Sequence, residues 1–260
     1  MGIRLNNVSF AYDSEYIFNK LNLEISNNSI TGVIGKSGSG KTTFLNLISG
    51  LEKPNKGKIT YDDLDIERSD IGYIFQNLED NFLSIYVKDE LEVSLKNYNI
   101  NKDLNHALKM IGLKEDILSK KISELTNGEK RLIAILSVLV YNPKIILFDE
   151  PTTGLDYKNK KKVISLIKTL KNKYEKTIII VSHDVDLLYE LCDNLILISN
   201  GKIILYGDPI SVYEEINLIN EYDIPIPKVV LFENLVRKKK IKLLKSRNAN
   251  DLIKEVYRNV

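Results

Sequence analysis

The chain has 260 residues, of which 43% are hydrophobic and 28% charged, and its 37 basic and 35 acidic residues leave a formal net charge of +2. This composition is typical of a soluble globular protein with a full core, and its charge balance provides no general attraction to nucleic acid or anionic membranes. The single cysteine, Cys192, excludes an intrachain disulfide and a cysteine-rich metal site and favours a reducing, cytoplasmic compartment.

The sequence shows no segment that would enter a membrane. Its N-terminal stretch lacks the apolar core of a secretory signal. No stretch reaches the ~18 consecutive apolar residues that a transmembrane helix needs. We therefore expect any association with a membrane to run through a partner.

Hydrophobic periodicity and turn residues predict the secondary structure. In chain order, they predict antiparallel strands at 3–12 and 21–25, a strand at 29–34, a helix at 43–48, strands at 57–62 and 70–75, a helical block from about 77 to 140 whose last helix is 132–139, a strand at 144–148, a helix at 159–170, a strand at 177–181, a helix at 184–192, and a hairpin of 195–199 and 202–206.

This order predicts an α/β fold. Buried strands that alternate with helices indicate a mainly parallel sheet covered on both faces. The first strands form a small antiparallel layer, and the block at about 77–140 is an inserted helical subdomain. Beyond Asp208-Pro209 we expect a polar helical extension, interrupted by the rigid extended segment Ile224–Pro227.

The clearest motif runs from Gly35 to Thr42 and fits the phosphate-loop pattern G-x-x-x-x-G-K-[ST]. Its glycines let the backbone approach an anion, toward which successive N–H groups and the N-terminus of the next helix point. Lys41 is the point charge for the β- and γ-phosphates, and the Thr42 hydroxyl suits Mg²⁺. A strand before the motif and a helix after it favour this interpretation over a Gly/Ser-rich surface turn.

Two consecutive carboxylates, Asp149 and Glu150, end the apolar strand at 144–148. Asp149 lies where it can hold Mg²⁺, and Glu150 can orient and polarise an attacking water. Paired acids at a strand end can also be the solvated start of a loop, but the phosphate loop earlier in the chain favours the catalytic interpretation.

Two further polar residues follow predicted strands. Gln76 ends the strand at 70–75 and has an amide that can contact both Mg²⁺ and the water. His183 follows the strand at 177–181, where it can act on the γ-phosphate, although a lone histidine is more often structural. The other histidine, His106, lies in a polar helical stretch and is expected at the surface.

The segment Leu125–Glu129 precedes the apolar-faced helix at 132–139. Thr126 is a credible N-cap, and Glu129 follows at the spacing of a capping box. The segment is therefore either a helix start alone or a helix start that also binds an anion from another molecule.

Taken together, Gly35–Thr42, Gln76, Leu125–Glu129, Asp149-Glu150, Gly154–Asp156 and His183 resemble, in order and spacing, the motifs of the ATP-binding cassette (ABC) ATPases. The resemblance covers residues 1 to about 208. It implies a P-loop NTPase fold with ATP and Mg²⁺ as cofactors. It also implies a dimer, since Leu125–Glu129 would be the signature motif that caps the ATP of the opposite subunit.

The resemblance implies a role for each matching residue. Glu150 is the catalytic base, His183 stabilises the transition state, Gln76 senses the γ-phosphate and the membrane partner, and Asp156 signals across the dimer. Metal contacts fall to Thr42, Gln76 and Asp149. Contacts with ATP fall to Tyr12 (stacked on the adenine), Gly35, Lys36, Ser37, Gly38, Ser39, Gly40, Lys41, Thr42 and Thr43, and to Thr126, Asn127, Gly128 and Glu129.

The signature departs from the usual Leu-Ser-Gly-Gly-Gln. Asn127 is the non-glycine residue best able to take a left-handed backbone, so we expect the local conformation to survive. Glu129 brings a negative charge to a helix end that faces phosphate, which is unfavourable unless Lys130 or Arg131 offsets it. We expect weakened capping, and hence a heterodimer whose other subunit supplies the better signature.

Two features are similar to the ATPases of energy-coupling factor importers. One is the acidic segment Phe75–Phe82, in which Leu78 replaces a usual proline, and the other is the C-terminal extension, which contributes to dimerisation in that family. The resemblance implies a nucleotide-binding domain at 1–210 and a dimerising extension at 211–260. The acids Glu79, Asp80, Asp89 and Glu90 would then face basic helices of a membrane scaffold, or simply form a solvated face.

The resemblance thus implies an ATPase that powers uptake of a vitamin or metal ion, peripheral on the cytoplasmic side of the membrane. Its expected partners are a second ATPase subunit, in a hetero- or homodimer, a membrane scaffold and a substrate-binding membrane subunit. One alternative is a soluble ABC ATPase that acts on DNA or as an assembly factor. Another is an ABC ATPase of a different transporter type. DNA-acting members carry long coiled coils, for which residues 76–125 are too short, so no nucleic acid is expected. A non-hydrolysing regulatory subunit is a third interpretation, against which intact Lys41, Asp149, Glu150 and His183 argue. The basic run 237–240 is either a phosphate- or lipid-binding patch or a solvated face.

Overall fold

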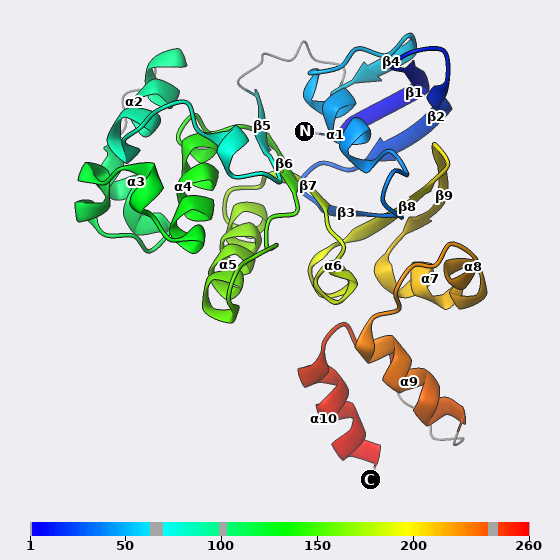
Figure 1. The fold of residues 1–260 in the computed structure, drawn as a ribbon. Coiled ribbons are helices and arrows are strands. Elements are labelled where there is room, and N and C mark those ends of the chain that lie inside the picture. Colours follow the sequence, from blue (N-terminus) through cyan, green and yellow to red (C-terminus); the bar gives the residue numbers. More distant parts are fainter. Residues whose placement is uncertain (1, 63–69, 99–102, 239–243, 260) are drawn as a thin grey trace.

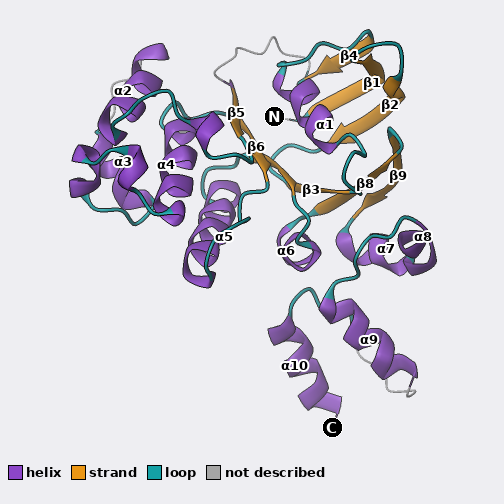
Figure 2. Ribbon diagram, viewed as in Figure 1, coloured by secondary structure: helices purple, strands orange, loops and turns teal. Residues whose placement is uncertain are grey.

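The computed structural model describes residues 2–62, 70–98, 103–238 and 244–259, and two sheets organise the chain (Figures 1 and 2). The antiparallel sheet has the order β2-β1-β4, made of β1 (Ile3–Ala11), β2 (Tyr16–Ile25) and β4 (Lys56–Thr60). The second sheet has the order β5-β6-β7-β3-β8-β9, made of β3 (Ile30–Ile34), β5 (Ile71–Ile74), β6 (Ile145–Asp149), β7 (Thr177–Val181), β8 (Asn194–Ser199) and β9 (Lys202–Gly207). Its strands are parallel except for the hairpin β8–β9. The predicted α/β fold, with a mainly parallel sheet and a small antiparallel layer, is confirmed.

The central strands are apolar throughout because both faces of their sheet are covered. In β7, Ile179 and Val181 pack into the core shared with the antiparallel sheet, whereas Ile178 and Ile180 pack into the core on the opposite face. Strands β6 and β8 alternate in the same way. The period of two along each strand therefore separates two cores, one on each side of the sheet.

Helix α1 (Lys41–Ser49) fills the space between the two sheets, since its buried Phe44, Leu45 and Ile48 belong to the core that also contains β1 and β2. The opposite face of the parallel sheet is covered by α5 (Tyr157–Asn172), α6 (Val185–Leu191) and α7 (Pro209–Glu214). Strand β2 starts at Tyr16, earlier than predicted, because its first residues pair with the end of β1.

The helical block contains α2 (Val87–Asn97), α3 (Leu104–Met110) and α4 (Asn127–Leu139), which lie together to one side of the sheets (Figure 1). Helix α4 begins five residues before the predicted start at Leu132. Its N-cap is Thr126, whose side chain accepts a hydrogen bond from the Glu129 N–H. The capping box, rather than the apolar periodicity, therefore sets the first residue of this helix.

The C-terminal extension consists of α7, α8 (Ile216–Glu221), α9 (Lys228–Lys238) and α10 (Ala249–Asn259). Helices α9 and α10 project away from the sheets (Figure 1). Arg247 ties them back to α6, because its guanidinium donates to the carbonyl oxygens of Tyr189 and Cys192. The Lys228 N–H also donates to Asp186 at 2.7 Å. Of the basic run 237–240, residues 239–240 lie outside the described residues.

Among the helices in the described ranges, none combines the length and apolarity needed to cross a bilayer.

Gly72 in β5 allows this strand to lie close to α4. A Cβ atom at Gly72 would come within 3.0 Å of Val138 Cγ1 and of Pro143 Cγ. Both neighbours are stiff side chains in a packed core, so they cannot give way cheaply. The contact fixes the helical block against the strand that leads to Gln76.

We expect Gly72→Ala to lower the free energy of unfolding by about 1–3 kcal/mol through overpacking, measured by urea denaturation. The control is Gly207→Ala at the end of β9, where the nearest atom to a new Cβ, Val212 Cγ2, is 3.9 Å away. Equal effects of the two substitutions would show that the Gly72 contact is not tight.

Candidate functional site

The loop Gly35–Thr42 joins β3 to α1 at the carboxyl edge of the parallel sheet. Gly35 runs against β8, since a Cβ there would lie within 3.0 Å of the Ile198 carbonyl oxygen. Gly40 has a φ of 103°, a left-handed value that favours glycine, and it packs against Phe18 of β2. Close packing on both sides thus shapes the loop before any ligand is bound.

The Lys41 side chain folds back into this loop. Its Nζ donates to the carbonyl oxygens of Gly35 and Lys36 at 2.8 and 2.9 Å. Burial lowers the pKa of Lys41, and the nearby Glu150 and Asp149 carboxylates oppose that shift. Within the described residues, the buried Ser39 Oγ has no hydrogen-bond partner. A loop with a partly buried ammonium and an unpaired hydroxyl fits the phosphates of ATP, whose oxygens accept from both.

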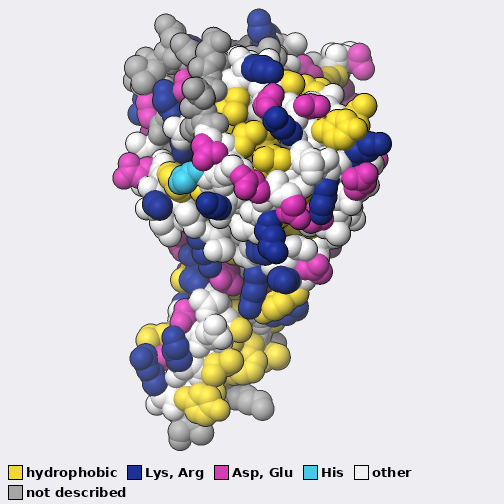
Figure 3. Space-filling view, turned by 90° about the vertical axis from the view of Figure 1, so that its left-hand side faces the viewer, with side chains coloured by type: hydrophobic (Ala, Val, Ile, Leu, Met, Phe, Trp, Pro, Cys, Tyr) yellow, Lys and Arg dark blue, Asp and Glu magenta, His cyan; other side chains and the backbone are white. Residues whose placement is uncertain are grey.

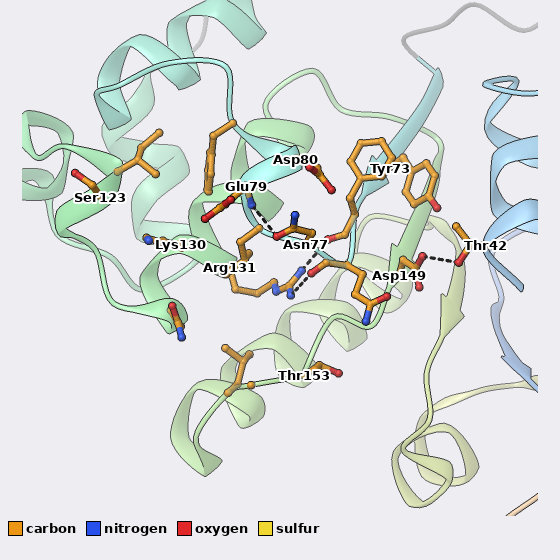
Figure 4. Close-up of a pocket in the computed structure, with 18 of the residues that line it drawn as sticks. Thr42, Tyr73, Asn77, Glu79, Asp80, Ser123, Lys130, Arg131, Asp149 and Thr153 are labelled. Carbon is orange, nitrogen blue, oxygen red and sulfur yellow. Dashed lines mark hydrogen bonds between the residues drawn. The ribbon is translucent and has the colours of Figure 1, made fainter. Parts of the chain in front are cut away.

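Asp149 ends β6 directly opposite the start of α1. Its Oδ2 accepts a hydrogen bond from Thr42 Oγ1 at 3.2 Å (Figure 4). Burial raises the pKa of Asp149; the Thr42 hydrogen bond opposes this, and the adjacent Glu150 adds to it. A buried carboxylate beside a hydroxyl is an oxygen pair that Mg²⁺ prefers, and a cation there would favour the charged form of Asp149.

Glu150 is the next residue, and the chain turns sharply at it. Its φ is 50°, in the left-handed region, and its side chain is buried. The carboxylate accepts hydrogen bonds from the His183 N–H at 2.7 Å, Thr153 Oγ1 at 2.8 Å and Ser182 Oγ at 3.1 Å. His183 Nε2 lies 3.9 Å from Glu150 Oε1, and the histidine side chain is 60% exposed. The structure therefore brings Glu150 and His183 together, as the sequence predicts.

A cleft of about 1080 Å³ opens beside these residues. Thr42, Gln76 and Asp149 line it together, so the three predicted metal contacts share one space. Figure 4 shows Thr42 and Asp149 at one end of the cleft and Ser123 and Lys130 at the other. The cleft thus runs from the phosphate loop to the helical block.

Arg131 connects the two ends of this cleft, a role that its sequence did not predict. Its buried guanidinium donates to the carbonyl oxygens of Phe75 and Gln76, both at 2.9 Å (Figure 4). Burial lowers the pKa of Arg131, while Asp149 and Glu150 raise it. Arg131 follows Glu129 and Lys130 directly and precedes the apolar run that starts at Leu132, so its sequence context is that of a charged helix start and gives no signal of a buried, partnered cation.

The signature segment differs from expectation in two respects. Asn127 does not take a left-handed backbone; it is the first residue of α4, where helical backbone suits any residue. Glu129 is not offset by Arg131, which faces Phe75 and Gln76 instead. Its carboxylate binds back to the Thr126 N–H and hydroxyl at 2.9 and 2.8 Å. Those two bonds lower the pKa of Glu129, and Lys120 and Lys162 lower it further.

Gly128 and Asp156 belong to one contact. A Cβ at Gly128 would lie within 3.0 Å of the Asn159 amide, and Asn159 in turn donates to Asp156 through its N–H and its Nδ2. Asp156 is the N-cap of α5. The signature segment and the predicted signalling aspartate are therefore adjacent within one chain.

Tyr12 follows the end of β1 and is 55% exposed. Its ring packs edge-on against Phe10, with centroids 4.9 Å apart, and Phe10 pairs with Phe18, the residue beside Gly40. The exposed Tyr12 ring is thus connected to the phosphate loop through Phe10 and Phe18, and its stacking on the adenine stays a prediction.

Glu90 does not face a partner, contrary to the sequence-based prediction. It is buried, and its Oε2 accepts from the N–H groups of Leu83 and Ser84, each at 2.8 Å. Glu79, Asp80 and Asp89 are exposed, and the first two line the cleft. Glu90 instead holds the loop that presents Leu83 at the surface.

The Glu129 capping box predicts a pH-dependent contribution to stability. Its folded-state pKa is below the ordinary value of 4.5, so its stabilising effect is full above that value and is lost as the pH falls through the lower, folded value. We expect the difference in unfolding free energy between the natural protein and Glu129→Gln, measured in urea, to shrink in that acid range. A difference that is constant with pH would contradict the assignment.

Comparison with known proteins identifies the family. The family model described as ABC transporter matches residues 18–153. The energy-coupling factor transporter ATP-binding protein EcfA2 of Clostridium tetani (strain Massachusetts / E88) is 32% identical over 259 residues, which cover 92% of this chain and 90% of that protein. The protein EcfA1 of Ureaplasma parvum serovar 3 (strain ATCC 700970) is 32% identical over 272 residues, which cover 100% and 92%.

Many solved structures are similar to the chain, and two of them are described here. One is cbiO1 from Clostridium perfringens, part of the ABC transporter complex cbiONQ, with a TM-score of 0.73, 27% identity, and coverage of 89% of this chain and 98% of that chain. The other is the ATP-binding cassette MJ0796, a dimer in a post-hydrolysis state bound to ADP and Pi, with a TM-score of 0.71, 28% identity, and coverage of 80% and 98%. The chain belongs to the ABC transporter family, and it is an ATP-binding, ATP-hydrolysing member of that family.

Proposed function

We propose that this ATPase is the nucleotide-hydrolysing subunit of an energy-coupling factor importer for a vitamin or metal ion, and that it sits on the cytoplasmic face of the membrane. The observation that carries the proposal is the convergence of Lys41, Thr42, Asp149 and Glu150 at one sheet edge, beside a cleft that reaches the helical block. The names of relatives that match nearly the whole chain support the transporter class.

In the proposed reaction, the loop N–H groups and Lys41 bind the β- and γ-phosphates. Thr42, Asp149 and Gln76 would hold Mg²⁺, which supplies charge stabilisation on the phosphate oxygens. Glu150 accepts a proton from the attacking water. His183, exposed next to Glu150, donates to the γ-phosphate as negative charge develops on it.

The site is completed by a second ATPase subunit. The Thr126–Glu129 segment starts a helix on the opposite side of the cleft from Thr42, so it is placed to bind the nucleotide of a neighbour. Because the Glu129 charge is turned back onto Thr126, the signature is weakened and not abolished, which favours a heterodimer.

Two exposed apolar surfaces match the two proposed interfaces. On the extension, Leu231, Phe232 and Leu235 of α9, together with Leu244 and with Ile253 and Tyr257 of α10, are exposed; Figure 3 shows apolar side chains gathered at this end of the molecule. This surface suits dimerisation. Exposed Ile85 lines the cleft together with the acids Glu79 and Asp80, and Leu83, two residues before Ile85, is also exposed, which suits a basic, amphipathic helix of a membrane scaffold.

We expect Glu150→Gln to reduce ATP turnover by on the order of 10²–10⁴-fold and to leave ATP binding intact, because only the proton acceptor is lost. Turnover is measured by phosphate release and binding by equilibrium titration. The matched control is Glu190→Gln. Glu190 is an exposed glutamate on α6 that forms an ion pair with Lys168 on α5. Near-natural turnover of Glu150→Gln would refute its role as the base.

The two surfaces predict separable interfaces. We expect Leu235→Glu to weaken association with the second ATPase subunit by about tenfold or more, since it buries a charge in an apolar contact.

Leu83→Glu should weaken association with the membrane scaffold and spare the ATPase pair. Both are measured by co-purification from membranes and by light scattering of the soluble subunits.

The same purification tests the transporter class. A membrane scaffold and a small substrate-binding membrane protein in the complex support the proposal, and turnover should rise when the second ATPase is present. Recovery of DNA or ribosomes would contradict the transporter class. Full activity as a homodimer of this chain would contradict the heterodimer.

A further inference from the structure

The catalytic glutamate is held by hydrogen bonds from two separate segments of the chain. Glu150 is 4% exposed and has a left-handed backbone with a φ of 50°. Its N–H still donates to the Val181 carbonyl oxygen at 2.9 Å, so the chain leaves β6 and turns its side chain toward the end of β7. A glutamate in this backbone region is strained, and such strain persists only where neighbouring contacts hold it.

Those contacts occupy most of the acceptor positions of the carboxylate. Oε1 accepts from the His183 N–H, and Oε2 accepts from the hydroxyls of Thr153 and Ser182. An ionised carboxylate has about four acceptor positions. Donors among the described residues fill three of these positions, which leaves about one, on Oε1, for a water molecule. That oxygen is also the one 3.9 Å from His183 Nε2.

The two hydroxyls differ in what else they do. Ser182 is buried, and its Oγ also accepts from the Asp184 N–H at the start of α6. Thr153 is exposed, lies in the turn after β6, and borders the cleft together with Thr42, Gln76 and Asp149 (Figure 4). The Thr153 hydroxyl therefore serves Glu150 without also supporting the start of a helix.

We propose that Thr153 is a positioning residue for hydrolysis: its hydroxyl fixes the Glu150 carboxylate so that the free acceptor position on Oε1 receives the attacking water. The inference rests on the proposed role of Glu150 as base. Without this hydroxyl, Ser182 is the one donor to Oε2 that remains among the described residues, and the carboxylate can rotate away from the orientation that the water requires. Misplacement of a reacting group by about 1 Å can cost ~10²-fold in rate.

The test compares Thr153→Val, which has the same shape without the hydroxyl, with Thr153→Ser, which retains it. On the assembled ATPase, we expect Thr153→Val to lower kcat by about 10- to 100-fold, with KM for ATP and the Kd for ATP without Mg²⁺ unchanged. Thr153→Ser should restore the lost turnover. If the role of Thr153 were purely structural, the substitutions would instead change the Kd for ATP and the thermal stability, and Thr153→Val and Thr153→Ser would not differ in turnover.

A readout in the nucleotide-free protein is independent of turnover. In Thr153→Val, the loosened carboxylate should protect the His183 N–H less, so that this amide exchanges its proton faster by NMR than in Thr153→Ser. Unchanged exchange together with unchanged kcat would overturn the inference.

A double-mutant comparison separates this inference from the proposed function. In the Glu150→Gln background, Thr153→Val should add no further loss, since it acts through Glu150. A full additional loss would overturn the positioning role, as would equal kcat values for Thr153→Val and the natural protein. If Glu150→Gln itself retained turnover, the role of Glu150 as base would fail, whatever Thr153 does.

Discussion

The site depends on keeping two consecutive carboxylates, Asp149 and Glu150, buried at the end of one strand. Each is 4% exposed, and burial raises the pKa of Asp149 with a further contribution from Glu150. Lys41 and Arg131 oppose that shift. Asp149 accepts a hydrogen bond from the Thr42 hydroxyl, and Glu150 accepts from two hydroxyls and one N–H group. A buried carboxylate without such partners would be protonated or destabilising, so these neighbours are a condition for the chemistry.

The parallel sheet provides those neighbours because its strands end at one edge. Strand β3 leads to Lys41 and Thr42, β6 to the two acids, β7 to Ser182 and His183, and β5 to Gln76. Arg131 adds a link from α4, and Gly72 allows that helix to approach β5. Gln76 and the signature segment are therefore parts of one packed unit.

The extension is also connected to the nucleotide loop. Lys36 forms an ion pair with Asp223, which follows α8. The backbone carbonyl of Lys36 also accepts a hydrogen bond from Lys41. Because the ion pair is exposed, its contribution to stability is small, but it places the start of the extension against the phosphate loop. The partly buried contacts of Arg247 with α6 then hold the helices that carry the exposed apolar surface.

The sequence by itself determined the features that consecutive residues encode. Strand β7 matches its predicted range, since an apolar run between turn residues has one stable placement in a covered sheet. The phosphate loop and the capping box of Thr126 and Glu129 are likewise encoded by residues that lie close together in the sequence. The observed bounds differ from the predicted ones where distant pairing or a cap sets them. Strand β2 starts earlier because it pairs with β1, and α4 starts earlier because Thr126 caps it.

Only the tertiary structure decided what stands opposite each side chain. Glu90 reads as a surface acid yet binds two N–H groups inside the protein, and Arg131 finds its partners 55 and 56 residues earlier in the chain. Thr153 and Ser182 lie beside predicted catalytic residues, but their shared acceptor depends on the left-handed turn at Glu150. The energy of a buried polar group is set by its partners, and folding brings those partners from separate parts of the chain.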